Sequence, residues 1–336
     1  MNQSINISTS TFLRFILIIL GMAFLYLIRD VLLMVFIALI IAAAIDGPVD
    51  WLARHKVRRV FGAAIAYLLI VAFFALFMYL IVPPLAGQIK LLATDLPDYL
   101  TKLGAGVQLL EQKIGTQNLQ KLLEKAGDQL ADATSNIFGT AVSIFGGIFS
   151  AVVIFVISIY LVVQDKAIKI FLSNITPPAH QVYVIDLAER IQRKLGAWLR
   201  GQILLMGIVG LMVFVGLTLL KVKFALTLAL LAGLFEIIPY AGAVLGATPA
   251  VILAFFQSPL LASLVIALFV VVQQLENHLI VPQVMKRAVG LNPLVIIISL
   301  IIGGNLAGIL GVVVAVPIAA IISVFLSDIF KRGEVA

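Results

Sequence analysis

Long runs of apolar side chains recur along this chain and restrict its fold more than any other feature. Several runs of about 18 or more mostly apolar residues are each long enough to cross a hydrocarbon core of roughly 30 Å as a helix. The hydrophobic fraction is 62%, the charged fraction 12% and the mean hydropathy +1.18, whereas soluble domains are about half apolar and about a quarter charged. Alternating segments of about ten residues, which are typical of a transmembrane barrel, are not found. The sequence predicts an all-α polytopic membrane protein.

Cysteine usage and net charge exclude several kinds of site. The chain has no cysteine, which excludes disulfides and thiolate metal sites, and we expect neither a metal nor a cofactor. A net charge of +7 would also fit a nucleic-acid partner, but in a membrane protein a basic excess usually marks cytoplasmic loops. We therefore interpret the charge as topology and expect no nucleic acid. Residues 12–28 are interpreted as a membrane helix and not as a signal peptide, because many further spans follow.

A basic segment orients the first three apolar runs. Runs 12–28 and 31–45 are followed at 50–59 by Arg and Lys side chains in excess over acids. Short basic loops stay in the cytoplasm, so we expect this segment and the amino terminus to lie inside. Residues 60–82 then cross outward. The Pro-Pro pair at 83–84 is expected to end that helix, because proline supplies no backbone donor.

Residues 85–138 differ in character from the apolar runs around them. Lysines and acids nearly balance there, as expected of an external segment. Apolar residues at alternating spacings of three and four predict two amphipathic helices, with Gly115 and Thr116 in the turn between them. This external helical hairpin packs on itself or on the membrane surface, or it forms a contact between subunits. Its apolar stripes favour a homo-oligomer.

The chain returns to the cytoplasm through residues 139–163. The positive loop that follows contains VYVIDLAERIQRKLGAWL (182–199), whose apolar side chains share one face opposite the basic ones. This pattern is typical of a helix that lies in the cytoplasmic interface, with Trp198 at headgroup depth. Residues 202–220 then cross outward and 259–275 cross inward. We expect both termini in the cytoplasm.

The whole chain should therefore form about seven to eight hydrophobic helices. Residues 224–257 form either a re-entrant hairpin or two cramped spans, and the same alternatives apply to 293–326. The expected parts are N-terminal transmembrane helices at 1–84, external amphipathic helices at 85–138, a transmembrane helix with the cytoplasmic interfacial helix at 139–200, and a transport domain with paired broken helices at 201–336.

Two apolar segments are interrupted by glycine and proline in a similar way: EIIPYAGAVLGATPA (236–250) and LAGILGVVVAVPIA (306–319). Such residues break a helix and leave backbone groups unpaired, and lipid cannot satisfy those groups. Paired short, interrupted segments therefore indicate a transport site. The candidate path residues are Pro239, Gly242, Gly246 and Pro249 in the first segment, and Gly303, Gly304, Asn305, Gly308, Gly311 and Pro317 in or just before the second.

Polar side chains near these interruptions are further candidates. A carboxylate at mid-membrane costs roughly 2.5 to 3.5 kcal/mol, so Glu236 either faces the path or lies near a helix end and reaches an interface. Gln273, Glu276 and Asn277 share one helix face, which could coordinate a polar solute or be an exposed helix end. Pro282 is expected to end their helix, and Glu276 to be better solvated than Glu236.

A family resemblance rests on three blocks of sequence. EIIPYAGAVLGATPA, QQLENHLIVPQVM and VGLNPLVIIISLIIGGNLAGILGVVVAVPIAA together resemble the autoinducer-2 exporter family of bacterial permeases, over about residues 10 to 330. The resemblance implies a multi-pass protein of the bacterial inner membrane that exports small molecules without ATP. Some members are assigned to export of autoinducer-2 and others to sodium/proton antiport.

Other classes of function fit the sequence less well. The chain lacks HExxH, GxSxG and the P-loop motif, so an enzyme is not expected. A membrane scaffold would use the external and interfacial helices but would leave Glu236 and the paired interruptions unexplained. We therefore expect export of a small polar solute such as autoinducer-2 by alternating access, with sodium (lithium)/proton antiport as the alternative and Na⁺ or H⁺ as the candidate coupling ion.

The topology can be tested by cysteine labelling, because the chain has no native cysteine. A cysteine at Gly115 is expected to react with a membrane-impermeant maleimide from outside intact cells, and a cysteine at Lys56 only in inverted vesicles. Labelling of the Gly115 position from the inside alone would reverse the scheme.

Overall fold

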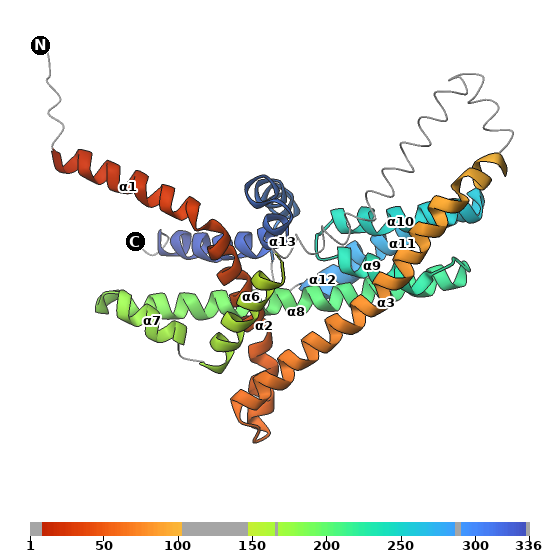
Figure 1. Cartoon of the computed structure of the whole chain (residues 1–336). Helices are drawn as coiled ribbons and strands as arrows, with labels where there is room; N and C mark the ends of the chain where they lie inside the picture. Colours follow the sequence, from red (N-terminus) through yellow and green to blue (C-terminus); the bar gives the residue numbers. More distant parts are fainter. Residues whose placement is uncertain (1–8, 103–146, 165–166, 286–289, 334–336) are drawn as a thin grey trace, which may run out of the picture.

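The computed structural model describes residues 9–102, 147–164, 167–285 and 290–333, and within these ranges every element is helical (Figure 1). Most of the expected external hairpin lies outside the described residues. The elements are α1 (Thr9–Leu27), α2 (Arg29–Arg54), α3 (Arg59–Lys102), α6 (Gly147–Val163), α7 (Ala167–Ile175), the 3-10 turn η1 (Pro178–His180), α8 (Gln181–Leu219), α9 (Ala225–Phe235), α10 (Ala241–Gln257), α11 (Pro259–Leu275), the π turn η2 (Glu276–Ile280), α12 (Val281–Met285) and α13 (Pro293–Gly333).

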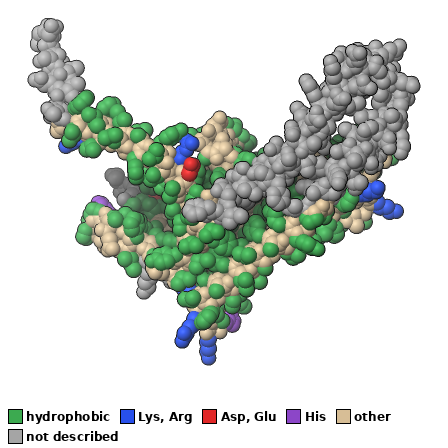
Figure 2. Space-filling view, viewed as in Figure 1, with side chains coloured by type: hydrophobic (Ala, Val, Ile, Leu, Met, Phe, Trp, Pro, Cys, Tyr) green, Lys and Arg blue, Asp and Glu red, His purple; other side chains and the backbone are tan. Residues whose placement is uncertain are grey.

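The lengths and composition of these helices confirm an all-α polytopic membrane protein. Among the described residues, five helices are long and apolar enough to cross a membrane, or up to six if a bent pair counts as one span. α9 and α10 are apolar but shorter. Figure 2 shows hydrophobic side chains spread over the described part of the visible surface, with only a few Lys and Arg side chains among them. Such a surface suits a hydrocarbon environment.

Helix α8 connects two hydrophobic cores. Its second half packs Val213 and Leu217 against Leu228 of α9 and Val265 of α11. Its first half packs against α2 and α13 in a separate cluster. Figure 1 shows α8 running from the α2, α7 and α13 side of the molecule to the α9–α11 side. A single straight element therefore joins the two sides.

This continuity corrects the prediction for residues 182–199. They do not form a separate interfacial helix but the first half of α8, which continues directly into the predicted span at 202–220. Trp198 is only 2% exposed and packs with Ile40 of α2 and Val316 of α13, so it does not face lipid headgroups. The apolar face was identified correctly, but protein covers it.

The first half of α8 is also tied to the end of α13 by an ion pair. Arg190 Nη1 and Nη2 each donate to one carboxylate oxygen of Asp328, both at 2.6 Å. Paired hydrogen bonds of this kind fix the relative orientation of the two side chains. Asp328 therefore has a structural contact at the end of α13.

Proline ends fewer helices than predicted. α3 continues through the pair at 83–84 to Lys102, so the boundary expected at residue 84 falls inside a helix. Pro282 likewise lies within α12, directly after η2. Proline removes a donor but keeps a helical φ, and neighbouring groups in an apolar bundle can satisfy the freed carbonyl. Within η2 the amide of Val281 donates to Glu276 O, the wider spacing of a π turn, immediately before the proline.

Both interrupted segments fold back on themselves. α9 and α10 are joined by a turn at residues 236–240, and Gly246 of α10 lies against Ala232 of α9, where an added Cβ would approach the Ala232 Cα to 2.8 Å. α13 breaks at Ala307 and Gly308, whose φ is 58°. This break lies after the Gly303–Asn305 stretch that corresponds to the IIPY turn of the first segment.

Glycine allows the two halves of α13 to touch. An added Cβ on Gly303 would overlap the carbonyl oxygen of Gly311, and one on Gly311 would overlap that of Gly303. The backbones are therefore in direct contact on both sides of the break. Any side chain at either position must separate the halves.

Gly311→Ala is accordingly expected to lower the free energy of unfolding by about 1–3 kcal/mol, because overpacking displaces backbone. Thermal unfolding in detergent measures this. Gly21→Ala is the matched control, since its added Cβ would have nothing within 4 Å. Equal melting temperatures for the two variants would contradict the close packing.

Candidate functional site

The turn between α9 and α10 is stabilised by contacts from outside the hairpin. α9 ends as Pro239 removes a donor and Tyr240 adopts a φ of 65°. The last carbonyls of a helix have no partner within it. One of them, Glu236 O, accepts a hydrogen bond of 2.6 Å from Gln202 Nε2 of α8. Gln202 is 2% exposed, so this buried amide is used to hold the break.

The side chain of Glu236 forms a pair with Glu276. The two carboxyl groups lie close enough to interact, and Gln273 Nε2 donates to Glu276 Oε2 at 3.2 Å. Glu236 is 3% exposed and Glu276 is 5% exposed. A carboxylate only accepts hydrogen bonds, so a bond between two carboxyl groups requires that one of them carries a proton. The two groups can therefore bond to each other only when they share a proton.

Each member of the pair lies at an interruption of helical geometry. Glu236 follows the last residue of α9, and Glu276 is the first residue of the π turn η2. π turns occur frequently at functional sites. Within the described part of the chain, Glu236 Oε2 is buried without a hydrogen-bond partner. The pair thus retains an acceptor that a bound group could use.

Small residues bring the surrounding helices close to the pair. An added Cβ on Gly242 would overlap the carbonyl oxygen of Phe235. Gly233 of α9 lies against Gly210 of α8, where an added Cβ would approach the Gly210 Cα to 3.3 Å. These contacts allow α9, α10 and α8 to meet around the break.

Among the described residues, none of the remaining candidates discussed below is seen to contact the carboxyl groups of this pair. Asn277 is exposed, although its neighbour Glu276 is buried. Pro249 is half-buried inside α10, and Asn305 is exposed and donates to Ile301 O of its own helix at 2.9 Å. The other candidates of the second segment contact one another within α13 or lie along it: Gly303, Gly304, Gly308, Gly311 and Pro317.

Two features of the site were missed or misjudged from the sequence. Glu276 was expected to be clearly better solvated than Glu236, but it is buried as well, at 5% exposed against 3%. Gln202 was not identified, although an amide at the start of an apolar run is a recognisable signal. Its partner could not be predicted because Glu236 O becomes unpaired only where the chain breaks. Across the described ranges, no group of three or more His, Asp or Glu side chains forms a metal cluster.

Long apolar helices, two folded-back segments and a buried polar site at one of the breaks define a polytopic membrane transporter. The chain belongs to the AI-2E transporter family, since the family model described as "AI-2E family transporter" matches residues 15–331. This result confirms the resemblance inferred from the three sequence blocks.

Curated bacterial relatives cover most of the chain. YueF of Bacillus subtilis (strain 168) is 29% identical over 305 residues, which are 85% of this chain and 81% of the relative. Sll0063 of Synechocystis sp. is 29% identical over 298 residues, covering 85% and 74%. YhhT of Escherichia coli (strain K12) is 25% identical over 299 residues, covering 88% and 84%. Each of these relatives is named "Putative transport protein".

The hydrogen bond from Gln202 can be tested by stability. Gln202→Leu leaves Glu236 O buried without its donor, which should lower the free energy of unfolding by about 1–3 kcal/mol. Gln274→Leu is the control, because Gln274 is exposed. If thermal unfolding in detergent shows no difference between the variants, the amide does not stabilise the break.

Proposed function

We propose that the chain exports a small polar solute, such as the signal autoinducer-2, across the bacterial inner membrane without ATP. The observation that carries the proposal is the buried pair of Glu236 and Glu276 at the break between α9 and α10. Buried ionisable groups in a membrane protein are costly and usually mark a substrate or ion pathway. We propose further that both termini face the cytoplasm and that the protein forms a homo-oligomer.

The pair has the chemistry needed to bind a polar solute. One protonated and one ionised carboxyl group together offer a hydrogen-bond donor and several acceptors. Glu236 Oε2 has no partner among the described residues, so it is available as an acceptor. A solute hydroxyl or amine could therefore bind between the two carboxyl groups.

Alternating access requires an element that moves relative to the rest. α9 and α10 are short, and their contacts with α8 and with each other involve glycine and alanine. At these contacts no large side chain interlocks the helices, although Leu228 of α9 packs against Val213 and Leu217 of α8 elsewhere. In the proposed mechanism a shift of this hairpin changes the side of the membrane from which Glu236 can be reached.

Sodium (lithium)/proton antiport is the second candidate, and the same pair favours it. Hard cations bind oxygen ligands, and a cation between the carboxyl groups would displace their shared proton. Exchange of one for the other would couple the two fluxes. A membrane scaffold, the candidate from another class, gives no role to a buried carboxyl pair.

Glutamine substitutions in liposomes that contain only the purified protein test the role of the pair. Glu236→Gln and Glu276→Gln keep the size of the side chain but remove its titration. Each variant is expected to reduce pH-dependent flux at least about tenfold if the proton on that carboxyl group is used. The larger effect is expected from Glu236→Gln, because Glu236 Oε2 is buried without a hydrogen-bond partner among the described residues. The measurement compares efflux of autoinducer-2 with Na⁺ uptake under an imposed proton gradient.

Glu189→Gln is the control, because Glu189 lies on the first half of α8, is only half-buried and pairs with Lys169 of α7. It should transport like the unmodified protein. Near-normal flux from both pair variants would remove the carboxyl groups from the mechanism. Loss of Na⁺ exchange with no autoinducer-2 efflux in any sample would favour the antiporter.

A further inference from the structure

A proline interrupts the hydrogen-bond ladder of α2. Pro48 lies inside this helix and has no N–H. In an α-helix that N–H would donate to the carbonyl four residues earlier, which is Ala44 O. Ala44 is 6% exposed, so water does not reach its backbone freely. An unpaired buried carbonyl is costly, and a partner must come from elsewhere.

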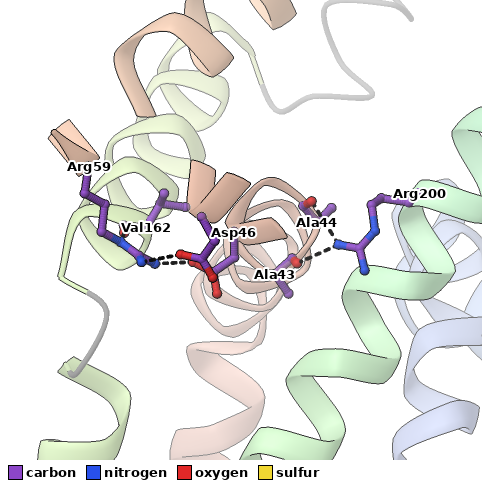
Figure 3. A network of polar contacts seen from close by, with 7 residues as sticks. Ala43, Ala44, Asp46, Arg59, Val162 and Arg200 are labelled. Carbon is purple, nitrogen blue, oxygen red and sulfur yellow. Dashed lines mark hydrogen bonds and ion pairs between the residues drawn. The ribbon is translucent and has the colours of Figure 1, made fainter. Parts of the chain in front are cut away.

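That partner is an arginine of α8. Arg200 Nη1 donates to Ala44 O at 3.0 Å and to Ala43 O at 3.2 Å (Figure 3). Its guanidinium group therefore occupies the place of the donor that Pro48 lacks. Arginine is suited to this role because it is always charged and has several fixed N–H donors.

The surrounding residues make room for this contact. An added Cβ on Gly196 would overlap the carbonyl oxygen of Ala43, and it would lie 3.1 Å from Arg200 Nη1. An added Cβ on Gly47 would lie 3.5 Å from the same nitrogen. The lack of a side chain at Gly196 therefore lets α8 approach the backbone of α2, whereas a Cβ at Gly47 would make only an ordinary van der Waals contact.

A second arginine holds the same turn of α2 from the opposite side. Arg59 donates to Asp46, to Asp50 Oδ1 at 2.6 Å and to Val162 O at 2.7 Å. Figure 3 shows Arg59 and Arg200 on opposite sides of α2. The interrupted turn is therefore held between α8 on one side and α3 with α6 on the other.

Arg200 lies two positions before Gln202, the residue that holds the α9–α10 break. We propose that Arg200 is a positioning residue that replaces the hydrogen bond removed by Pro48, so that one turn of α8 holds both α2 and the break that carries Glu236. Any effect of Arg200 on transport through Glu236 rests on the proposed function. The replacement of the missing hydrogen bond by Arg200 is independent of the proposed function.

A double-mutant cycle tests the replacement. Arg200→Met removes the donor and leaves Ala44 O unpaired, so the melting temperature in lipid nanodiscs should fall. Pro48→Ala returns an N–H to α2. In the Pro48→Ala background, Arg200→Met should therefore lower the melting temperature by at most about half as much as it does in the unmodified protein. An equal fall in both backgrounds would overturn the idea that Arg200 substitutes for the proline's missing donor. Arg193→Met, an exposed arginine of the same helix, is the control.

A distance measurement tests the link to α9–α10. Spin labels at the exposed positions Leu32 of α2 and Val244 of α10 can be attached to a chain without native cysteine. Arg200→Met should broaden their distance distribution with or without Pro48→Ala, because the restored helical bond does not reach α8. Arg200→Lys, which keeps a donor, should broaden it less. An unchanged distance distribution in Arg200→Met would overturn the link between Arg200 and the α9–α10 break. Neither the melting temperature nor the distance distribution depends on transport, so failure of this inference is distinguishable from failure of the proposed function.

Discussion

The structure depends on supplying hydrogen-bond partners to backbone carbonyls where helices are interrupted in apolar surroundings. Lipid offers no donor, so each freed carbonyl must be satisfied by protein. Ala44 O in α2 receives a donor from Arg200, and Glu236 O at the end of α9 receives one from Gln202. Both donors come from one turn of α8. The interruptions of two distant segments are therefore stabilised by the same short stretch of chain.

The continuity of α8 gives this stretch its importance. One half of the helix packs on α2 and α13 and the other half packs on α9, α10 and α11. Arg200 and Gln202 lie near the middle, between the two clusters. A displacement of α9 and α10 against α8 would act first on the bond from Gln202, whereas the bond from Arg200 keeps α8 on α2.

Local sequence patterns identified several parts of the site but not their contacts. The interruption after Glu236 and the proximity of Gln273 to Glu276 follow from proline, glycine and helical spacing, which are local properties. The pairing of Glu236 with Glu276 joins segments far apart in sequence, and no local pattern reports it. Pro83, Pro84 and Pro282 were misjudged for a related reason. Whether a proline ends a helix depends on what satisfies the freed carbonyl, and that partner belongs to the tertiary structure.

The sequence alone determined the class of this protein, because apolar runs longer than a bilayer is thick leave only spanning helices as a stable fold. It also determined where helices are vulnerable, since proline and glycine act through their own backbones. Only the tertiary structure decided that Trp198 is covered by α2 and α13, that Gln202 holds a carbonyl and that two buried glutamates from distant segments lie together. Burial and pairing are set by neighbours from other segments, and these neighbours exist only after the helices have packed.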